Sequence, residues 1–236
     1  MAKSNTAHML YINANPAAPI DDKPVLHDLR LSALLGASAW AHLPPAVRRR
    51  FSRRLDANAS VTYAGEVVES RRTRFGKLLA QFCRLLGAPL PLYDDIATPA
   101  VVTVIEDRAT GGQFWTRMYG RKRGFPQIIH SSKRFAGPTG LEEYLGCHFG
   151  IALTLGADAG ALHFHSDHYF VLLGAVRWRL PRWLEPGVLT ISHIERGDGW
   201  FAFVLVLRHK LFGEIIRQTG LFQERLVHTG KEKLHD

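Results

Sequence analysis

From residue 99 to residue 226 the sequence alternates between short apolar runs and turns rich in Gly and Asp. Three such turns are Thr110-Gly111-Gly112, Ala157–Gly160 and Arg196–Gly199. Links this short join antiparallel neighbours, because a parallel crossover needs a dozen or more residues. The runs predicted as strands are 99–107, 112–120, 125–136, 139–146, 148–156, 160–179, 187–196, 199–208 and 213–226.

The longest run, Ala161–Pro181, indicates how these strands lie in the sheet. Residues counted by twos from Leu162 are mostly apolar, whereas the opposite set begins with His163, His165 and Asp167. Alternation with a period of two is typical of a half-buried strand. The alternation fades toward the middle of the run, which predicts burial on both faces and a central place in the sheet.

The length of 236 residues suits one domain with short extensions. We divide the chain into a flexible leader (1–27), a single β-rich domain (28–226) and a tail (227–236), with helices in 28–87 and the sheet in 98–226. The predicted fold class is α+β. A strongly curved antiparallel meander sheet or partial β-barrel of about eight strands is expected, with two or three N-terminal amphipathic helices packed on it.

Two of these helices are basic and amphipathic. The first follows Leu43-Pro44-Pro45 and carries Val47, Phe51 and Leu55 on one face, while the second covers about 71–87. Packing of the apolar stripes on the sheet is the favoured interpretation, and contact with an anionic membrane is the alternative. The stripe of the second helix is Phe75, Leu78, Leu79, Phe82 and Leu86.

The charge and the cysteine content limit which partners and which cellular compartment are expected. Thirty Lys and Arg residues against 21 Asp and Glu give a net charge of +9, so anionic partners are considered. Nucleic acid is not expected, because the arginines lack the interleaved aromatic residues of a base-stacking surface. Only Cys83 and Cys147 are present, and no segment has signal-peptide or membrane-spanning length. These features predict a soluble cytoplasmic protein with reduced thiols.

The run His163–His168 reads H-x-H-x-D-H, the metal-ligand signature of the metallo-β-lactamase superfamily. In a continuous strand His163, His165 and Asp167 point one way and His168 the other, so the four side chains would not converge. That superfamily is also an αβ/βα sandwich rather than a meander. No metal is therefore expected, and a metal-dependent hydrolase stays an alternative that a hairpin turn within this run would favour.

The segment 113–120 places Trp115, Arg117 and Tyr119 on one strand face. An arginine between two aromatic rings can anchor an anionic headgroup while the rings cover an apolar body. The competing interpretation pairs Arg117 with a carboxylate such as Glu143. We predict Trp115, Arg117, Tyr119 and Glu143 as ligand-lining residues, and no catalytic residue or cofactor is expected.

Several landmarks occur in order from about Leu35 to Glu224. They are Leu43-Pro44 before a basic helix, Gly65, Leu90-Pro91, Trp115-x-Arg117-x-Tyr119, Glu143-x-x-Gly146, Gly174, Leu180-Pro181, Leu184-x-Pro186, Phe201-x-Phe203, Gly213 and Gly220. This series resembles a bacterial domain family of unknown function that occurs alone or fused after a saccharopine dehydrogenase-like reductase domain. Tyr119 departs from the phenylalanine expected there. The resemblance implies a β-rich domain with no assigned reaction and a reductase-like protein as a partner.

Curved antiparallel sheets covered by helices often leave a concave apolar pocket with a few polar anchors. We therefore predict a non-enzymatic binding or accessory domain for an apolar or amphipathic small molecule. One alternative is the metal-dependent hydrolase that uses His163, His165, Asp167 and His168. The other is peripheral association with anionic membranes through the basic helix that carries Arg48–Arg54.

Overall fold

The fold is taken from a computed structural model that describes residues 27–55, 59–87, 89–158, 160–174 and 176–229. The predicted leader, apart from His27, and the predicted tail beyond residue 229 lie outside the described residues. The elements are α1 (Arg30–Leu35), α2 (Ala37–His42), α3 (Pro45–Phe51), β1 (Ala59–Arg72), α4 (Arg74–Cys83), the 3-10 turn η1 (Arg84–Leu86), β2 (Thr98–Asp107), β3 (Gly112–Tyr119), β4 (Gln127–Arg134), β5 (Glu142–Gly146), β6 (Phe149–Asp158), β7 (Ala161–Leu173), β8 (Val176–Arg179), β9 (Val188–Gly197), β10 (Trp200–His209) and β11 (Gly213–Thr229).

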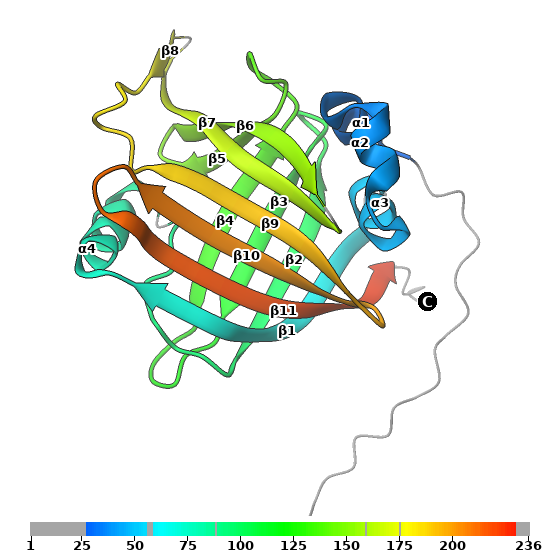
Figure 1. Cartoon of the computed structure of the whole chain (residues 1–236), viewed down its shortest axis with the longest axis horizontal. Helices are drawn as coiled ribbons and strands as arrows, with labels where there is room; N and C mark the ends of the chain where they lie inside the picture. The colour runs from blue at the N-terminus through cyan, green and yellow to red at the C-terminus, as the bar shows by residue number, and fades with distance from the viewer. Residues whose placement is uncertain (1–26, 56–58, 88, 159, 175, 230–236) are drawn as a thin grey trace, which may run out of the picture.

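Ten of the strands form a closed antiparallel barrel (Figure 1). The order is β6-β5-β4-β3-β2-β1-β11-β10-β9-β7, and β6 pairs with β7 to close the ring. The strand β8 lies outside the ring as a hairpin partner of β7. The prediction of a strongly curved antiparallel sheet is confirmed. The barrel, however, has more than the expected eight strands and is closed rather than partial.

Closure depends on β1, which pairs with β2 on one side and with β11 on the other. Gly65, near the middle of β1, lies opposite Ala100 and Phe222. A Cβ atom at Gly65 would lie 1.8 Å from the carbonyl oxygen of Leu221. The absence of a side chain at Gly65 therefore lets the first and last strands of the chain approach closely enough to pair.

A β-bulge in β7 changes which residues face the interior. Ala152 pairs with His168 but Leu153 pairs with Ser166, so Asp167 is the extra residue. Phe164 and Tyr169 consequently both line the interior. The histidines on both sides of the bulge instead lie on the outer face, and the prediction that His168 points away from His163 and His165 is wrong.

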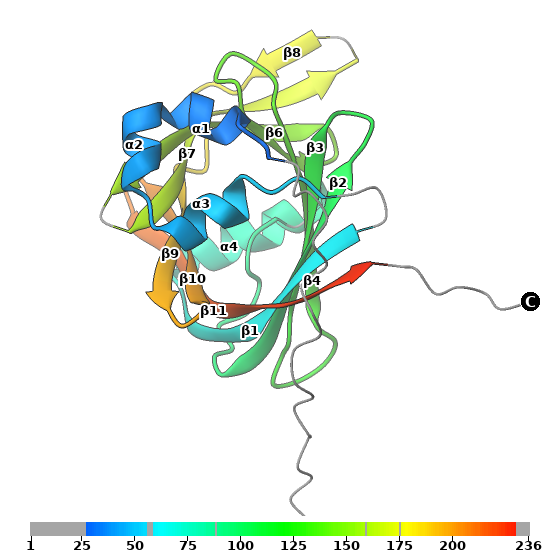
Figure 2. The same ribbon diagram turned by 90° about the vertical axis from the view of Figure 1, so that its right-hand side faces the viewer.

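The helices lie at the two ends of the barrel, with α1–α3 at one end and α4 at the other (Figures 1 and 2). In α3, Val47 and Phe51 are buried as predicted, and Leu55 packs against the core just beyond the helix. Among the described residues, no helix is both long enough and apolar enough to cross a bilayer.

The helix α4 packs through its smallest residues. Thr73 caps its N-terminus by accepting a hydrogen bond from the backbone N–H of Gly76. Gly76 and Ala80 are buried, and a Cβ atom at Gly76 would lie 2.2 Å from the carbonyl oxygen of Ile215 on β11. Leu78 and Phe82 are exposed, so the prediction that they pack on the sheet is wrong. The close approach at Gly76 turns the helix so that the two larger side chains face outward.

Candidate binding site inside the barrel

The barrel encloses a cavity of about 210 Å³. Most of its lining is apolar and comes from the barrel strands, and Leu79 of α4 and Leu184 of the β8–β9 loop line the α4 end. A dry apolar cavity of about 150 Å³ already holds a benzene-sized molecule, whereas drug-sized ligands occupy about 300–1,000 Å³. The volume therefore suits a small ligand.

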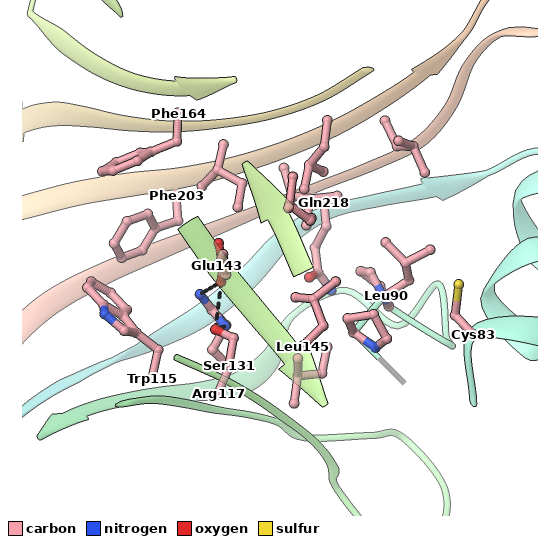
Figure 3. A pocket seen from close by; sticks show the side chains of 18 of the residues that line it. Cys83, Leu90, Trp115, Arg117, Ser131, Glu143, Leu145, Phe164, Phe203 and Gln218 are labelled. Carbon is pink, nitrogen blue, oxygen red and sulfur yellow. Dashed lines mark hydrogen bonds and ion pairs between the residues drawn. The ribbon is translucent and has the colours of Figure 1, made fainter. Parts of the chain in front are cut away.

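The charged side chains of the cavity, together with Ser131, gather on three neighbouring strands (Figure 3). Arg117 is on β3, Ser131 and Lys133 are on β4, and Glu143 is on β5. Lys133 lies directly opposite Glu143 in the antiparallel register, and Trp115 lies opposite Ser131. Because side chains alternate along a strand, these positions all face the interior.

Glu143 is the centre of this charge cluster. Its Oε1 accepts hydrogen bonds from Ser131 Oγ at 2.6 Å and from an Arg117 guanidinium N–H at 3.2 Å. Its Oε2 accepts from Lys133 Nζ at 2.9 Å. Arg117 also donates to Ser131 Oγ at 2.9 Å. The pairing of Arg117 with Glu143, the competing interpretation of the sequence, is thus present inside the same cavity.

The electrostatics of the cluster follow from burial and mutual attraction. Burial acts to raise the pKa of Glu143, but Lys133, Arg117 and the hydrogen bond from Ser131 together lower it to about 2. Burial lowers the pKa of Lys133, and Arg117 adds to that effect while Glu143 opposes it. Glu143 is therefore ionised at neutral pH. With Lys133 protonated, two cations face one carboxylate and the cluster carries a net positive charge.

Aromatic rings border the two cations. Lys133 Nζ lies 5.0 Å from the ring centre of Trp115 and 5.4 Å from that of Phe164, and the Arg117 guanidinium carbon lies 5.7 Å from the Trp115 ring. These distances permit cation–π attraction. The indole N–H of Trp115 is buried and has no hydrogen-bond partner among the described residues. A donor of this kind could serve an acceptor atom of a ligand.

The structure brings all four predicted residues, Trp115, Arg117, Tyr119 and Glu143, to one cavity. Sequence reasoning missed Ser131 and Lys133. Alternation in the strand predicted over 125–136 places Ile129, Ser131 and Lys133 on one face, which was the available signal. Gln218 of β11 also lines the cavity, and no sequence pattern pointed to it.

The histidines of the H-x-H-x-D-H run contact separate neighbours. His163 Nδ1 lies 2.8 Å from Ser192 Oγ, and His165 Nδ1 lies 3.1 Å from Thr190 Oγ1. His168 Nδ1 instead lies 2.6 Å from a carboxylate oxygen of the adjacent Asp167. Within the described part of the chain, no group of three or more His, Cys, Asp or Glu side chains is arranged to hold a metal ion.

Cys83 is not placed as an activated nucleophile, and Cys147 lies in a tight turn. Cys83 borders the cavity, where burial raises the pKa of its thiol to about 11. Cys147 and His148 form the turn between β5 and β6 and have positive φ angles of 46° and 65°.

The basic helix α3 turns part of its charge inward. The Arg50 side chain is only 6% exposed and donates to Glu195 at 2.6 Å. Its guanidinium carbon lies 4.2 Å from the ring centre of Phe201. Arg50 is therefore a structural residue at this end of the barrel, and the exposed charge of α3 is smaller than its sequence indicated.

Comparison with curated proteins and with solved structures found no significant match. A family model matches residues 43–222, close to the span from Leu35 to Glu224 that the ordered landmarks indicated. The match covers most of the chain, including the whole charge cluster and nearly all of the barrel. The chain therefore belongs to the family described as a domain of unknown function, DUF4166.

Proposed function

We propose that this chain is a binding or accessory domain that holds a small amphipathic molecule, with a single anionic group, inside its barrel. The observation that carries the proposal is the position of the charge cluster. Arg117, Ser131, Lys133 and Glu143 lie together on three adjacent strands of a mostly apolar cavity. A ligand with one charged end and an apolar body matches this distribution.

The sign of the ligand's charge follows from the spare donors of the cluster. Glu143 already accepts from three side chains. The Lys133 ammonium has three N–H donors and uses one of them on Glu143. An anion beside Lys133 and Arg117 would balance the excess positive charge and would raise the pKa of Lys133 toward its ordinary value.

Binding is favoured over catalysis because three of the buried titratable groups, Glu143, Cys83 and His193, have pKa values far from neutral pH. A general acid or base works best with a pKa near the operating pH. Here the pKa of Glu143 is about 2, that of the Cys83 thiol is about 11, and that of the buried His193 is about 3. Such groups hold fixed charge states, which suits the recognition of a charged end.

The test is a pair of calorimetric titrations of the full chain, one with octanoate and one with 1-octanol, together with native mass spectrometry of the purified protein. We expect octanoate to bind at least about tenfold more tightly than octanol, which lacks the charge. Lys133→Met should remove most of that preference. Arg134→Met is the matched control, because Arg134 is the next residue on β4 and contacts Asp107 and Tyr144 instead of the cavity.

Two outcomes would contradict the proposal. One is that neither compound binds and no small molecule co-purifies. The other is equal affinity for octanoate and octanol in the unsubstituted chain, which would show that the charge cluster does not contact the ligand.

A further inference from the structure

We propose that the α4 end of the barrel docks on an anionic membrane surface through an apolar rim. The rim consists of six side chains on three segments that meet at this end of the barrel. They are Leu78, Phe82 and Leu85 of α4 and η1, Trp183 of the β8–β9 loop, and Leu211 and Phe212 of the β10–β11 turn. This inference goes beyond the proposed ligand and does not require the cavity to be occupied.

The rim residues are large, apolar and well exposed, with exposed fractions between 54% for Phe212 and 82% for Leu211. Scattered exposed apolar residues are ordinary, but a concentration of them marks an interaction site. On α4 the exposure is a consequence of packing, because the buried face uses Gly76 and Ala80. The larger residues are therefore left on the outer side of the helix.

The three segments adjoin one another. The Phe75 ring of α4 lies 4.5 Å from the Phe212 ring of the β10–β11 turn. A Cβ atom at Gly187, which ends the β8–β9 loop, would lie 2.5 Å from the carbonyl oxygen of Arg208 at the end of β10. Figure 1 shows α4, the β10–β11 turn and the β8–β9 loop on the same side of the molecule.

Exposed cations flank the rim, which identifies an anionic surface as its partner. The segments 74–86, 179–187 and 209–213 contain a single carboxylate, Glu185. Lys77 lies 3.1 Å from Asp94, outside these segments, so its charge is partly compensated. Apolar side chains combined with Lys and Arg are typical of surfaces that insert into the headgroup layer of anionic membranes. The exposed cations are Arg74, Lys77, Arg84, Arg179, Arg182 and Lys210.

The opposite end of the barrel lacks this combination in the part of the chain that the structure describes. Its turns, 107–112 and 197–200, are built mainly from Gly, Asp and other small residues, together with Arg108 and the partly buried Trp200, and none of their residues is a large exposed hydrophobic one. Leu29, beside α1, is the most exposed large apolar residue described at that end. The asymmetry shows that the rim is a property of one end and not of the surface in general.

The rim lies next to residues that line the cavity. Leu79 and Cys83 line the cavity from the inner side of α4, next to the exposed Leu78 and Phe82. Leu184, next to Trp183, both lines the cavity and is 47% exposed. Docking through the rim would therefore place this end of the cavity near the lipid headgroups, where amphipathic molecules are concentrated.

The test is co-sedimentation of the full chain with phosphatidylcholine vesicles, prepared with and without roughly one third phosphatidylglycerol. We expect binding to the anionic vesicles that weakens when salt is raised to about 0.5 M. Leu78→Ser/Phe82→Ser should lower the vesicle partition coefficient by about tenfold or more, because two large apolar side chains no longer enter the lipid. Arg182→Glu/Lys210→Glu should lower binding to anionic vesicles only.

Matched controls lie at the opposite end of the molecule. Leu29→Ser removes an equally exposed apolar side chain, and Arg49→Glu reverses an exposed charge on α3. Neither should change vesicle binding, and thermal unfolding should be unchanged in all four variants because the substituted side chains are exposed.

Three outcomes would overturn the proposal. The first is no vesicle binding, and the second is an equal loss with the rim variants and the controls. The third is a dimer in light scattering that Leu78→Ser/Phe82→Ser converts to a monomer, which would assign the rim to a second copy of the chain. None of these outcomes depends on octanoate binding in the cavity, so each of the two proposals can be contradicted without affecting the other.

Discussion

Lys133 and Glu143 lie directly opposite each other on β4 and β5, with Lys133 Nζ 2.9 Å from a Glu143 carboxylate oxygen inside an apolar barrel. Burying one charge in such surroundings is costly, but a buried charge with several partners persists. Arg117 and Ser131 complete the set of partners. The pair is therefore expected to contribute to the stability of the barrel as well as to the proposed binding of a ligand.

Glu143→Gln should lower the free energy of unfolding by about 3 kcal/mol or more, because it leaves Lys133 and Arg117 buried without their counter-ion. Lys133→Met should cost less, since Glu143 keeps Arg117 and Ser131 as partners. Urea denaturation of both variants measures the difference. Glu66→Gln, at an exposed position of β1, is the control and should change stability by less than about 0.5 kcal/mol. A smaller loss for Glu143→Gln than for Lys133→Met would contradict this account.

Gly65→Ala should destabilise the barrel strongly, because the added Cβ atom would lie 1.8 Å from the Leu221 carbonyl oxygen and would force β1 away from β11. Such backbone displacement falls among the large mutational effects, and we expect a loss of about 2–4 kcal/mol or failure to fold. Gly156→Ala in β6 is the matched control. Its nearest neighbour would be the end of the His165 side chain, at 3.2 Å, which can move, and the Cβ atom of His163 would lie at an ordinary contact distance of 3.8 Å. Thermal unfolding should separate the two variants clearly, and similar midpoints would argue against a role for Gly65 in closure.

The strands were predictable because their signal is local. Period-two alternation and turns such as Asp198-Gly199 mark each strand without reference to any other part of the chain. Closure of the barrel was not predictable in this way, because it depends on which distant strands pair. The segment between the two predicted basic helices forms β1, and its pairing with β2 on one side and β11 on the other joins the two halves of the ring.

Only part of the candidate site could be predicted, because some of its residues are recognisable from local sequence and others depend on which strands pair. Trp115 and Arg117 stood out because an arginine between aromatic residues is an uncommon pattern. Lys133 lies in a strand with polar residues on both faces, so alternation groups it with Ile129 and Ser131, but only its pairing with Glu143 shows that this face is the inner one. The bulge at Asp167 likewise has no local signal, yet it moves His168 to the outer face. Features that depend on the register between paired strands cannot be predicted from one sequence alone.

Replacing the β5–β6 turn with Asn-Gly should stabilise the protein. Cys147 and His148 both have positive φ angles, 46° and 65°, a conformation that two-residue hairpins normally assign to Asn-Gly or Asp-Gly. The β9–β10 turn already uses Asp198-Gly199 with φ angles of 51° and 77°. We expect Cys147→Asn/His148→Gly to raise the free energy of unfolding by about 1–2 kcal/mol, measured by urea denaturation. Asp198→Asn, a change within an already favourable turn, should have little effect, and a lowered stability of the double variant would refute the interpretation.

The free energy of unfolding should decrease as the pH is lowered below about 6.5, because of His193. The side chain is enclosed by Phe51, Phe201 and Phe203, and burial together with the adjacent Arg50 lowers the pKa of His193 to about 3. Between about pH 6.5 and about pH 3 the unfolded chain therefore binds a proton that the folded chain does not. The contribution of His193 is fully present above the unfolded pKa and is lost progressively as the pH falls.

The magnitude of this effect can be isolated by substitution. Each pH unit in the window is worth up to about 1.4 kcal/mol, so the unsubstituted chain should lose about 2 kcal/mol between about pH 7 and about pH 5 on account of His193. His193→Phe removes the titrating group from an aromatic cluster, and Arg50 keeps its ion pair with Glu195. The variant should lose about 2 kcal/mol less over the same interval in urea denaturation, whatever its stability at pH 7. His130→Gln, at an exposed histidine of β4, should retain the full loss. If His193→Phe and the unsubstituted chain respond identically to pH, His193 is not the group that makes the barrel sensitive to acid.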